Sequence, residues 1–227
     1  MISIVIPAFN EEERIKGTLK KLLEFDSKYK RLKEIIVVNN GSTDATQTIL
    51  MGYSKKVKLI NLPVNLEKGG GIRAGIMAAK GDNVLFVDAD NPVAVEKILE
   101  VENKLKTSDI VIGRKVKIKP FSPVRFVLGK SFVLIVNILF NLDIWDVLTG
   151  FKGFRKDVAV DLFKDLKFRC WIFDLEILIK AKQRGYKIDK VDVEWRYDNL
   201  SKLRPLRDSI KIFMAVMKLR SSLHEIK

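Results

Sequence analysis

The chain has 227 residues, of which 47% are apolar and 31% charged, a composition typical of a folded protein and not of a disordered one. Its single cysteine, Cys170, excludes an internal disulfide framework and fits a reducing compartment, and its single histidine, His224, argues against a histidine metal site or a Ser-His-Asp triad. The formal charge of +14 favours anionic partners such as nucleotide phosphates, acidic lipid headgroups or nucleic acid, although a solvated basic surface would give the same balance.

The first hundred residues alternate between strand-like and helix-like segments. Short β-branched runs bounded by turn-forming residues predict strands, and apolar residues three and four apart predict helices. Strands are expected at residues 2–6, 34–38, 57–60 and 83–87, and helices at 14–25, 43–51 and 71–79. This alternation predicts an α/β fold with a mostly parallel, Rossmann-like sheet and helices on both faces.

The second half of the chain is less regular. The expected segments are a strand at 109–113, a basic loop at 114–120, an unusually apolar helix at 125–142, a return to the sheet at 150–155, a helix at 173–184, a late strand at 191–195 and an amphipathic basic helix at 207–219. Met1 leads directly into the first strand, so no signal peptide is expected. The apolar stretch at 132–142 is well below the ~20 residues that cross a bilayer, so no membrane span is expected either.

Three polar clusters follow predicted strand ends, at residues 8–11, 39–42 and 88–90. Ligands of parallel sheets bind at the carboxyl ends of the strands, so the three clusters are expected to converge. Asp88 and Asp90 flank the small Ala89 and can point at one ligand. Carboxylates together with substrate phosphates are the ligands that Mg²⁺ and Mn²⁺ prefer, so the pair predicts a divalent metal site. A turn or a helix cap is the alternative for such a short motif.

A run of three glycines occupies residues 69–71. Its spacing to Ala74 and Gly75 does not give the dinucleotide-binding pattern, and the chain contains no P-loop. The run is interpreted as a close backbone approach to a bound donor, or as a turn.

These clusters resemble, in order, the signature of family 2 glycosyltransferases, whose fold is called GT-A. The residues that carry the resemblance are Pro7-Ala8-Phe9-Asn10-Glu11, Val37-Val38-Asn39-Asn40-Gly41-Ser42-Thr43-Asp44 and Val87-Asp88-Ala89-Asp90. The likeness continues in Asn65 to Gly75, in Gly150-Phe151-Lys152-Gly153-Phe154 and in Phe173-Asp174-Leu175-Glu176. It spans roughly residues 2 to 202 and is most similar to the branch that glycosylates polyprenyl (dolichyl) phosphate, the dolichyl-phosphate mannose and glucose synthases.

The resemblance implies a role for each matching residue on the donor side. Asp88 is expected on the ribose side, and Asp90 is expected to bind the metal that bridges the diphosphate, with Asp88 beside it. Asn39 is expected to contact the base, and Lys68 to reach the donor phosphates, although a solvated loop charge is the alternative for Lys68. The remaining nucleotide-binding residues implied are Pro7, Ala8, Asn10, Glu11, Ser42 and Ala89.

Two departures from the family pattern affect these roles. Asn39-Asn40 stands where the family usually has Asp-Asp; asparagine keeps an acceptor oxygen for a base N–H but loses the negative charge. Pro92 stands where the mannose-synthase type tends to have a glutamine, and proline offers no side-chain ligand. Asn91 is the candidate for a third metal ligand.

The acceptor side combines cations with an apolar segment. The apolar run Phe132-Val133-Leu134-Ile135-Val136 is flanked by Arg114, Arg125, Lys130 and Ser131. An apolar segment with basic flanks predicts an element lying in the headgroup region of a membrane, with a buried core helix as the alternative. The helix at 207–219 is a second candidate for a membrane surface. Ser201-Lys202 matches a small polar element of the family, which adds Lys202 to the expected acceptor-binding residues.

The resulting hypothesis is an inverting transfer of mannose or glucose from GDP-mannose or UDP-glucose to polyprenyl phosphate, by a peripheral protein on the cytoplasmic face of a membrane. A phosphate acceptor is already ionised near neutral pH, since its second pKa is ~6, so no general base is required. Asp90 would act through the metal, and Arg114 and Arg125 would hold the attacking phosphate. Residues 1–227 would form one domain, with a nucleotide-sugar-binding half at 1–113 and an acceptor-facing half at 114–227.

Two alternatives remain open. A family 2 transferase acting on a carbohydrate or another hydroxyl would need a base, for which Asp146 and Asp174 are candidates. A non-catalytic nucleotide- or nucleic-acid-binding module would fit the charge of +14. The chain lacks, however, the interleaved aromatic and basic residues of a surface that binds single-stranded nucleic acid, so no nucleic acid is expected as a partner.

Overall fold

The computed structural model of the protein describes residues 1–90, 93–119, 123–142, 147, 149–170, 172–196, 214 and 216–221. The strands in this part of the chain are β1 (Ile2–Ala8), β2 (Leu32–Asn40), β3 (Lys58–Leu62), β4 (Asn83–Val87), β5 (Ile110–Lys119), β6 (Phe151–Arg155) and β7 (Ile188–Arg196). The helices are α1 (Ile15–Tyr29), α2 (Thr46–Met51), α3 (Glu67–Ala78), α4 (Lys97–Lys104), α5 (Pro123–Phe140), α6 (Lys156–Lys164) and α7 (Phe173–Gln183).

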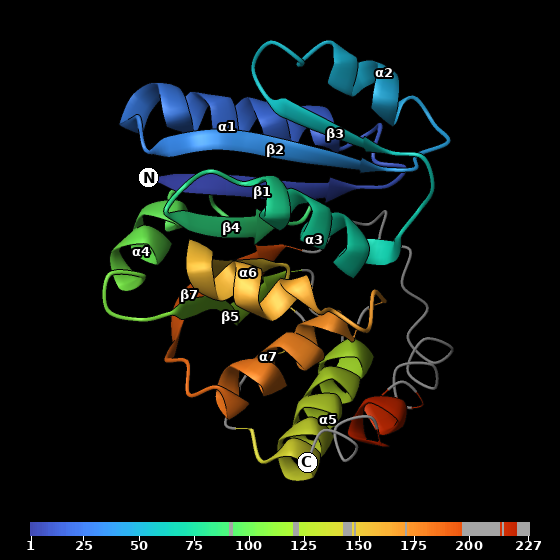
Figure 1. Ribbon diagram of the computed structural model, residues 1–227, viewed down its shortest axis with the longest axis vertical. Helices are drawn as coiled ribbons and strands as arrows, with labels where there is room; N and C mark the ends of the chain where they lie inside the picture. Colours follow the sequence, from blue (N-terminus) through green and yellow to red (C-terminus); the bar gives the residue numbers. More distant parts are fainter. Residues whose placement is uncertain are drawn as a thin grey trace.

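The strands form one seven-stranded sheet in the order β3-β2-β1-β4-β6-β5-β7 (Figure 1). β1 pairs in parallel with β2 and β4, β2 with β3, and β5 with β7. β6 runs antiparallel between β4 and β5. The predicted α/β fold with a mostly parallel sheet is therefore confirmed. Among the described residues β6 is the one reversed strand, and it lies next to β4, the strand directly before Asp88.

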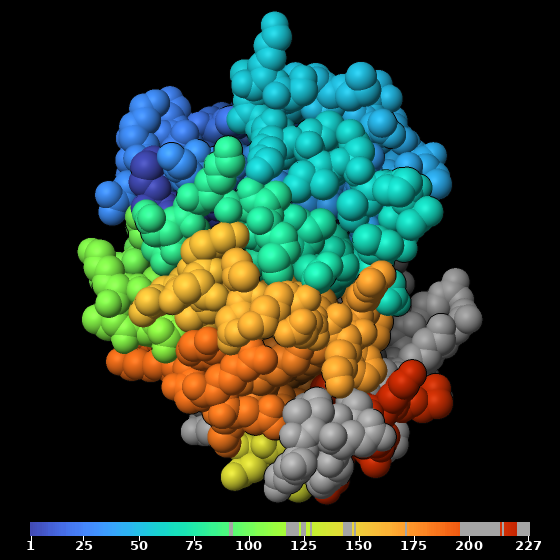
Figure 2. All heavy atoms as spheres, in the orientation of Figure 1, coloured from blue at the N-terminus to red at the C-terminus, as the bar shows by residue number. Residues whose placement is uncertain are grey.

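Alternate residues of the central strands supply two hydrophobic cores, one on each face of the sheet. Val5 faces the core that α3, α5, α6 and α7 cover, whereas Ile4 and Ile6 face the core under α1, α2 and α4. In Figure 2, α3, α6 and α7 make up much of the face turned toward the viewer. Strands buried on both faces read as continuous apolar runs, which is why residues 2–6, 34–38 and 83–87 were recognisable in the sequence.

Tertiary pairing changes two of the expected boundaries. The expected basic loop at 114–120 is strand as far as Lys119, because β7 pairs in parallel with β5 along its whole length. The helix expected from residue 71 begins at Glu67, so the interpretation of Gly69–Gly71 as a turn is wrong. α4 and α6 have no counterpart among the expected segments.

The glycines of α3 let that helix lie against the sheet and against α7. A Cβ atom at Gly75 would overlap with the side chain of Val5, and one at Gly71 would lie 3.2 Å from Nδ2 of Asn40. A Cβ atom at Gly69 would lie 2.8 Å from Cβ of Phe173. In the structure these glycines allow a close approach of the helix to β1, β2 and α7, whereas an approach of Gly69–Gly71 to a bound donor stays a prediction.

α5 is apolar around its circumference, and only part of that surface is covered. Val136 is fully buried and belongs to the core, whereas Leu134 and Ile138 are 60% and 72% exposed. The helical residues near the C-terminus show the same division: Val216 and Leu219 join this core, whereas Met217 is exposed. No helix among the described residues has the length and hydropathy that crossing a bilayer requires.

Candidate active site

The carboxylates of the D-x-D motif lie where β4 ends. Asp88 and Asp90 follow Val87, the last residue of the strand, and Lys68 from the first turn of α3 reaches them. Nζ of Lys68 lies 2.6 Å from Oδ1 of Asp88, and the two side chains are 17% and 23% exposed. Lys68 therefore belongs to the carboxylate cluster, and the alternative of a solvated loop charge is wrong.

The position of Asp88 depends on β6, the reversed strand. Its backbone N–H donates to the carbonyl of Gly150 at 3.1 Å, just before β6 begins. A Cβ atom at Gly150 would overlap with both carboxylate oxygens of Asp88. The glycine is thus required for Asp88 to occupy this position.

Asp90 is held from the side of α1. Nη1 of Arg14 lies 4.0 Å from Oδ2 of Asp90, and the hydroxyl of Thr18 donates to the carbonyl of Ala89 at 2.6 Å. Nε and Nη2 of Arg14 donate to the carboxylate of Glu11 at 2.7 and 2.8 Å, so Glu11, expected in the nucleotide pocket, orients an arginine beside the motif.

Burial, and next the charge of Asp88, raise the pKa of Asp90 to about 6, against the opposing charges of Arg14 and Lys68. The charge of Asp88 thus disfavours the ionisation of Asp90, and the two carboxylates together form an oxygen donor set suited to a hard divalent cation. Among the residues that the structure describes, no three His, Cys, Asp or Glu side chains cluster to hold a metal ion. Asn91 and Pro92 lie outside the described residues.

The two polar clusters after β1 and β2 are joined by hydrogen bonds. The backbone N–H of Asn10 donates to Oγ of Ser42 at 3.1 Å, and the N–H of Ser42 donates to Oδ1 of Asn39 at 3.2 Å. Nδ2 of Asn39 donates to Asn61 at the end of β3, and the side chain of Asn39 is almost fully buried. Ala8 pairs with Asn39 in the sheet and its side chain lies in the core, so it could offer a nucleotide only its backbone.

Asn40 fixes the connection that leads into α3. Its Oδ1 accepts from the N–H of Leu66 at 2.9 Å, and its Nδ2 donates to the carbonyl of Glu67 at 2.8 Å and to Oδ1 of Asn65 at 3.2 Å. An aspartate here would lose both donated bonds. Asn39 and Asn40 are also the last residues of β2 rather than the start of a turn, because β3 pairs with both. Pro7 lies beside this connection, 3.5 Å from a Cβ atom placed on Gly71.

A buried ion pair lies at the base of the cluster. Nζ of Lys152 on β6 lies 2.7 Å from Oδ1 of Asp174 in the first turn of α7, and the side chains are 1% and 4% exposed. Asp174 is thus buried and paired with Lys152. A carboxylate in this position is not suited to remove a proton from a hydroxyl acceptor. Asp146, the other candidate base, lies outside the described residues.

The expected acceptor residues are distributed differently. Nε and Nη2 of Arg114 donate to the carboxylate of Asp192 at 2.6 and 2.7 Å, across the β5–β7 pair. Lys130 and Ser131 lie on α5 with exposed side chains, and Nζ of Lys130 is 5.8 Å from the ring centre of Phe126. The side chain of Arg125 and all of Lys202 lie outside the described residues. The structure therefore brings together the donor residues; of the expected acceptor residues that it describes, Arg114 lies on β5, and Lys130 and Ser131 lie on α5.

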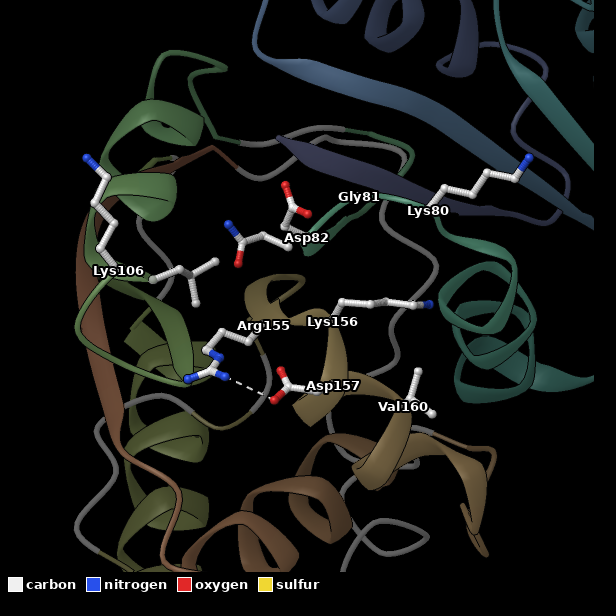
Figure 3. Close-up of a pocket in the computed structure, with 10 residues that line it drawn as sticks. Lys80, Gly81, Asp82, Lys106, Arg155, Lys156, Asp157 and Val160 are labelled. Carbon is white, nitrogen blue, oxygen red and sulfur yellow. Dashed lines mark hydrogen bonds and ion pairs between the residues drawn. The ribbon is translucent and has the colours of Figure 1, made fainter.

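A shallow basin of about 820 Å³ lies at the other end of the sheet, between the start of β4 and the start of α6 (Figure 3). Its carboxylates are already paired, Asp157 with Arg155 and Asp82 with the N-terminal ammonium group. Because it borders the amino end of β4, it is on the wrong edge for a ligand of a parallel sheet.

Four residues of the site were not predicted from the sequence: Arg14, Thr18, Gly150 and Lys152. Arg14 had a local signal, because it follows Glu11 at the i,i+3 spacing of a helical ion pair. Gly150 and Lys152 stood in a recognised motif, but nothing in the sequence joined them to Asp88 and Asp174.

Comparison with known proteins identifies the family. The family model "Glycosyl transferase family 2" matches residues 3–163. The chain is 33% identical to the dolichyl-phosphate beta-glucosyltransferase of Drosophila melanogaster, over 90% of this chain and 69% of that protein. It is 31% identical to the enzyme of the same name from Homo sapiens, over 90% and 70%.

Among solved structures, glucosyl-3-phosphoglycerate synthase of Mycobacterium tuberculosis in complex with UDP matches with a TM-score of 0.74, 20% identity, and coverage of 97% of this chain and 80% of that one. The same enzyme with Mn²⁺, UDP and glucosyl-3-phosphoglycerate gives a TM-score of 0.73 at 20% identity, over 97% and 79%. These likenesses establish a GT-A fold. With the family model covering most of the sheet and the site, the chain belongs to glycosyl transferase family 2.

Proposed function

We propose that the protein transfers glucose from UDP-glucose to dolichyl or another polyprenyl phosphate, with inversion, at a membrane surface. The observation that carries the proposal is the identity of about one third, over nine tenths of the chain, to proteins named dolichyl-phosphate beta-glucosyltransferase. The same relatives favour glucose over mannose, the sugar that the sequence left open. UDP in the structural neighbours is consistent with this donor.

The donor would lie across the carboxyl ends of β1, β2 and β4. Asn39, Ser42 and Asn10 would face the base, while Asp88 and Asp90 would face the ribose and the diphosphate. A Mg²⁺ or Mn²⁺ ion held by Asp90, with Asp88 beside it, would neutralise the diphosphate as it leaves. Lys68, 2.6 Å from Asp88, is placed to contribute a second positive charge to the same group.

The acceptor requires little acid–base chemistry from the protein. A lipid monophosphate is largely dianionic at neutral pH, with a second pKa of ~6, and can attack the anomeric carbon directly. The chain's task is to align this phosphate with the donor and to exclude water. Arg114, Arg125, Lys130, Ser131 and Lys202 are proposed to hold it. Asp192, which pairs with Arg114, would have to share that arginine with the acceptor phosphate.

The two halves of the chain would bind different substrates. Residues 1–113 would bind the nucleotide sugar, and residues 114–227 would face the acceptor and the membrane, as two halves of one domain. The exposed apolar side chains of α5 would enter the headgroup region without spanning the bilayer, on the cytoplasmic face. This arrangement brings a membrane-anchored phosphate to an enzyme whose donor is water-soluble.

A mixed-micelle assay tests the proposal. Radiolabelled UDP-glucose and GDP-mannose are offered separately, with polyprenyl phosphate and Mn²⁺ or Mg²⁺, and the lipid product is counted. We expect transfer from UDP-glucose, with GDP-mannose at least about tenfold poorer. Asp90→Ala should lower transfer by at least about a hundredfold, since it removes the carboxylate expected to hold the metal. Asp82→Ala, remote from the site, is the matched control. Transfer by Asp90→Ala without metal, or none by the wild type from either donor, would contradict the proposal.

A further inference from the structure

The ion pair of Lys152 and Asp174 is a buried charged group that the proposed reaction does not use. Besides Asp174, the ammonium group contacts the carbonyl of Thr149 and lies 5.5 Å from the ring centre of Phe86. Burying two charges is costly, and apolar side chains of similar volume often serve a core as well or better. Stability alone therefore does not account for the pair.

Asp174 lies close to a second lysine. The N–H of Gly69 donates to the carbonyl of Arg169 at 2.7 Å, and a Cβ atom at Gly69 would lie 2.8 Å from that of Phe173. The starts of α3 and α7 are thus in contact. Lys68 directly precedes Gly69 on α3, and Asp174 directly follows Phe173 on α7.

The electrostatics agree with this placement. Burial lowers the pKa of Lys68, but the charges of Asp88 and then of Asp174 outweigh burial and raise it. For Asp174, burial raises the pKa, while the charges of Lys152 and then of Lys68 oppose the rise. Asp174 is therefore a carboxylate within reach of two cations.

The two cations have different surroundings. Lys152 is almost fully buried and is bonded to Asp174, whereas Lys68 is partly exposed and is bonded to Asp88 at the donor edge. An uncompensated carboxylate at the depth of Asp174 would attract the nearest remaining cation strongly. Without Lys152, that cation is Lys68.

We propose that Lys152 is a positioning residue for donor binding: it neutralises Asp174 and so leaves Lys68 at the donor edge, beside Asp88, to meet the diphosphate. The inference rests on the proposed function, because it takes Lys68 to bind the donor diphosphate. It assigns to the buried pair a consequence for nucleotide affinity that a purely structural pair would not have.

Titration calorimetry with UDP, with and without Mn²⁺, tests the assignment. Lys68→Met should weaken UDP binding by about tenfold or more, the effect of one charge-assisted hydrogen bond. Lys152→Met should weaken it similarly, because Asp174 then competes for Lys68. Adding Asp174→Asn to Lys152→Met removes the competing charge and should restore UDP affinity to within about threefold of the wild type.

The double variant carries the test even if Lys152→Met alone does not fold, because it contains no uncompensated buried charge. Lys180→Met is the matched control: it removes the partner of Glu176, another buried carboxylate on α7, and should leave UDP affinity unchanged. A double variant that still binds UDP poorly, or an unchanged Lys152→Met, overturns the proposal. Unchanged binding by Lys68→Met overturns it too, while transfer from UDP-glucose by the wild type would leave the proposed function standing.

Discussion

Single residues decide whether the carboxylates of the site can take up their positions. Gly150 is the sharpest case, since any side chain there collides with Asp88. We expect Gly150→Ala to displace Asp88 and raise the KM for the nucleotide sugar at least about tenfold, the effect of losing one strong contact. The free energy of unfolding should fall by about 1–3 kcal/mol, as for other overpacked positions.

The matched variant is Gly17→Ala on α1, where a Cβ atom meets nothing within 4 Å. It should leave the KM unchanged and stabilise the protein by about 0.5–1 kcal/mol, because alanine is the better helix former. Donor kinetics and thermal unfolding measure both effects. If Gly150→Ala keeps the wild-type KM, Asp88 does not need its present position for donor binding.

At this scale the sequence predicted what is local. Asp88 and Asp90 were recognisable because a buried strand ends directly before them, and the end of a strand can be read from neighbouring residues. The glycine that accommodates Asp88 lies 62 positions further along the chain, directly before an antiparallel strand whose pairing no short pattern encodes. Contacts between residues this far apart in the chain can be identified only in the folded structure, and the same holds for the ion pair of Lys152 with Asp174.

The connection between β3 and α3 is an element whose conformation depends on one amide. Asn40 both accepts from and donates to this connection, and Oδ1 of Asn65 already accepts the N–H of Glu67, so Asn65 cannot turn over without losing that bond. We expect Asn40→Asp to lower the free energy of unfolding by about 1–3 kcal/mol. It should also raise the KM for the donor, because Lys68, proposed to bind the donor diphosphate, comes directly after this connection.

Asn39→Asp is the informative comparison. Nδ2 of Asn39 donates to the exposed side chain of Asn61, which can rotate its amide to become the donor. Both variants bury a new carboxylate, so Asn39→Asp should lower the free energy of unfolding by about 1 kcal/mol less than Asn40→Asp does. Chemical denaturation of both variants measures the difference. Equal losses would mean that the connection into α3 does not depend on the amide of Asn40.

The junction of α6, α7 and the segment before β7 is held by one carboxylate. Asp161 accepts from Tyr186 and forms ion pairs with Lys164 and Arg184. Hydrogen bonds from Lys164, and next from Tyr186, lower its pKa from 3.8 to about 2. A lowered pKa contributes stability that is complete above pH 3.8 and is lost as the pH falls through about 2.

Asp161→Asn should therefore destabilise the protein at pH 7 by about 1 kcal/mol, after allowance for solvent screening. The difference from the wild type should shrink between about pH 4 and pH 2. Asp157→Asn, a largely exposed residue with one surface partner, should change little at either pH. Denaturation across this pH range measures the effect, and a difference that stays constant to pH 2 would exclude Asp161 as its source.

Elements were predicted well where their pattern was self-contained and poorly where partners imposed them. β4 has the bounds expected from the sequence. Residues 114–119 carry the charges of a loop and are strand because β7 lies beside them. Gly69–Gly71 are poor helix formers that lie near the start of α3 because a side chain would collide with or crowd its neighbours there. α4 and α6 were not predicted, although each is amphipathic and buries one apolar face.

For the whole molecule, the two alternatives for the apolar helix are not exclusive. One side of α5 packs in the core through Val136, and the other exposes large apolar side chains, so the sequence could not have separated a core helix from an interfacial one. Figure 1 places α5 at the end of the molecule opposite α2. The exposed apolar side chains of α5 and the net charge of +14 of the whole chain are the observations behind the proposed contact of this end with an anionic bilayer.

We expect the protein to bind vesicles that contain acidic phospholipid, and to bind them less as salt is raised, because the lysine and arginine side chains are then screened. Leu134→Glu with Ile138→Glu should lower vesicle binding by at least about tenfold, since two apolar side chains no longer enter the headgroup region and two negative charges are added. Met51→Glu on α2 is the control, because Met51 is equally exposed at the other end of the molecule. Cosedimentation with vesicles measures binding, and UDP titration verifies an intact donor site. If the α5 variant and the α2 control bind alike, the exposed face of α5 is not the membrane surface of this enzyme.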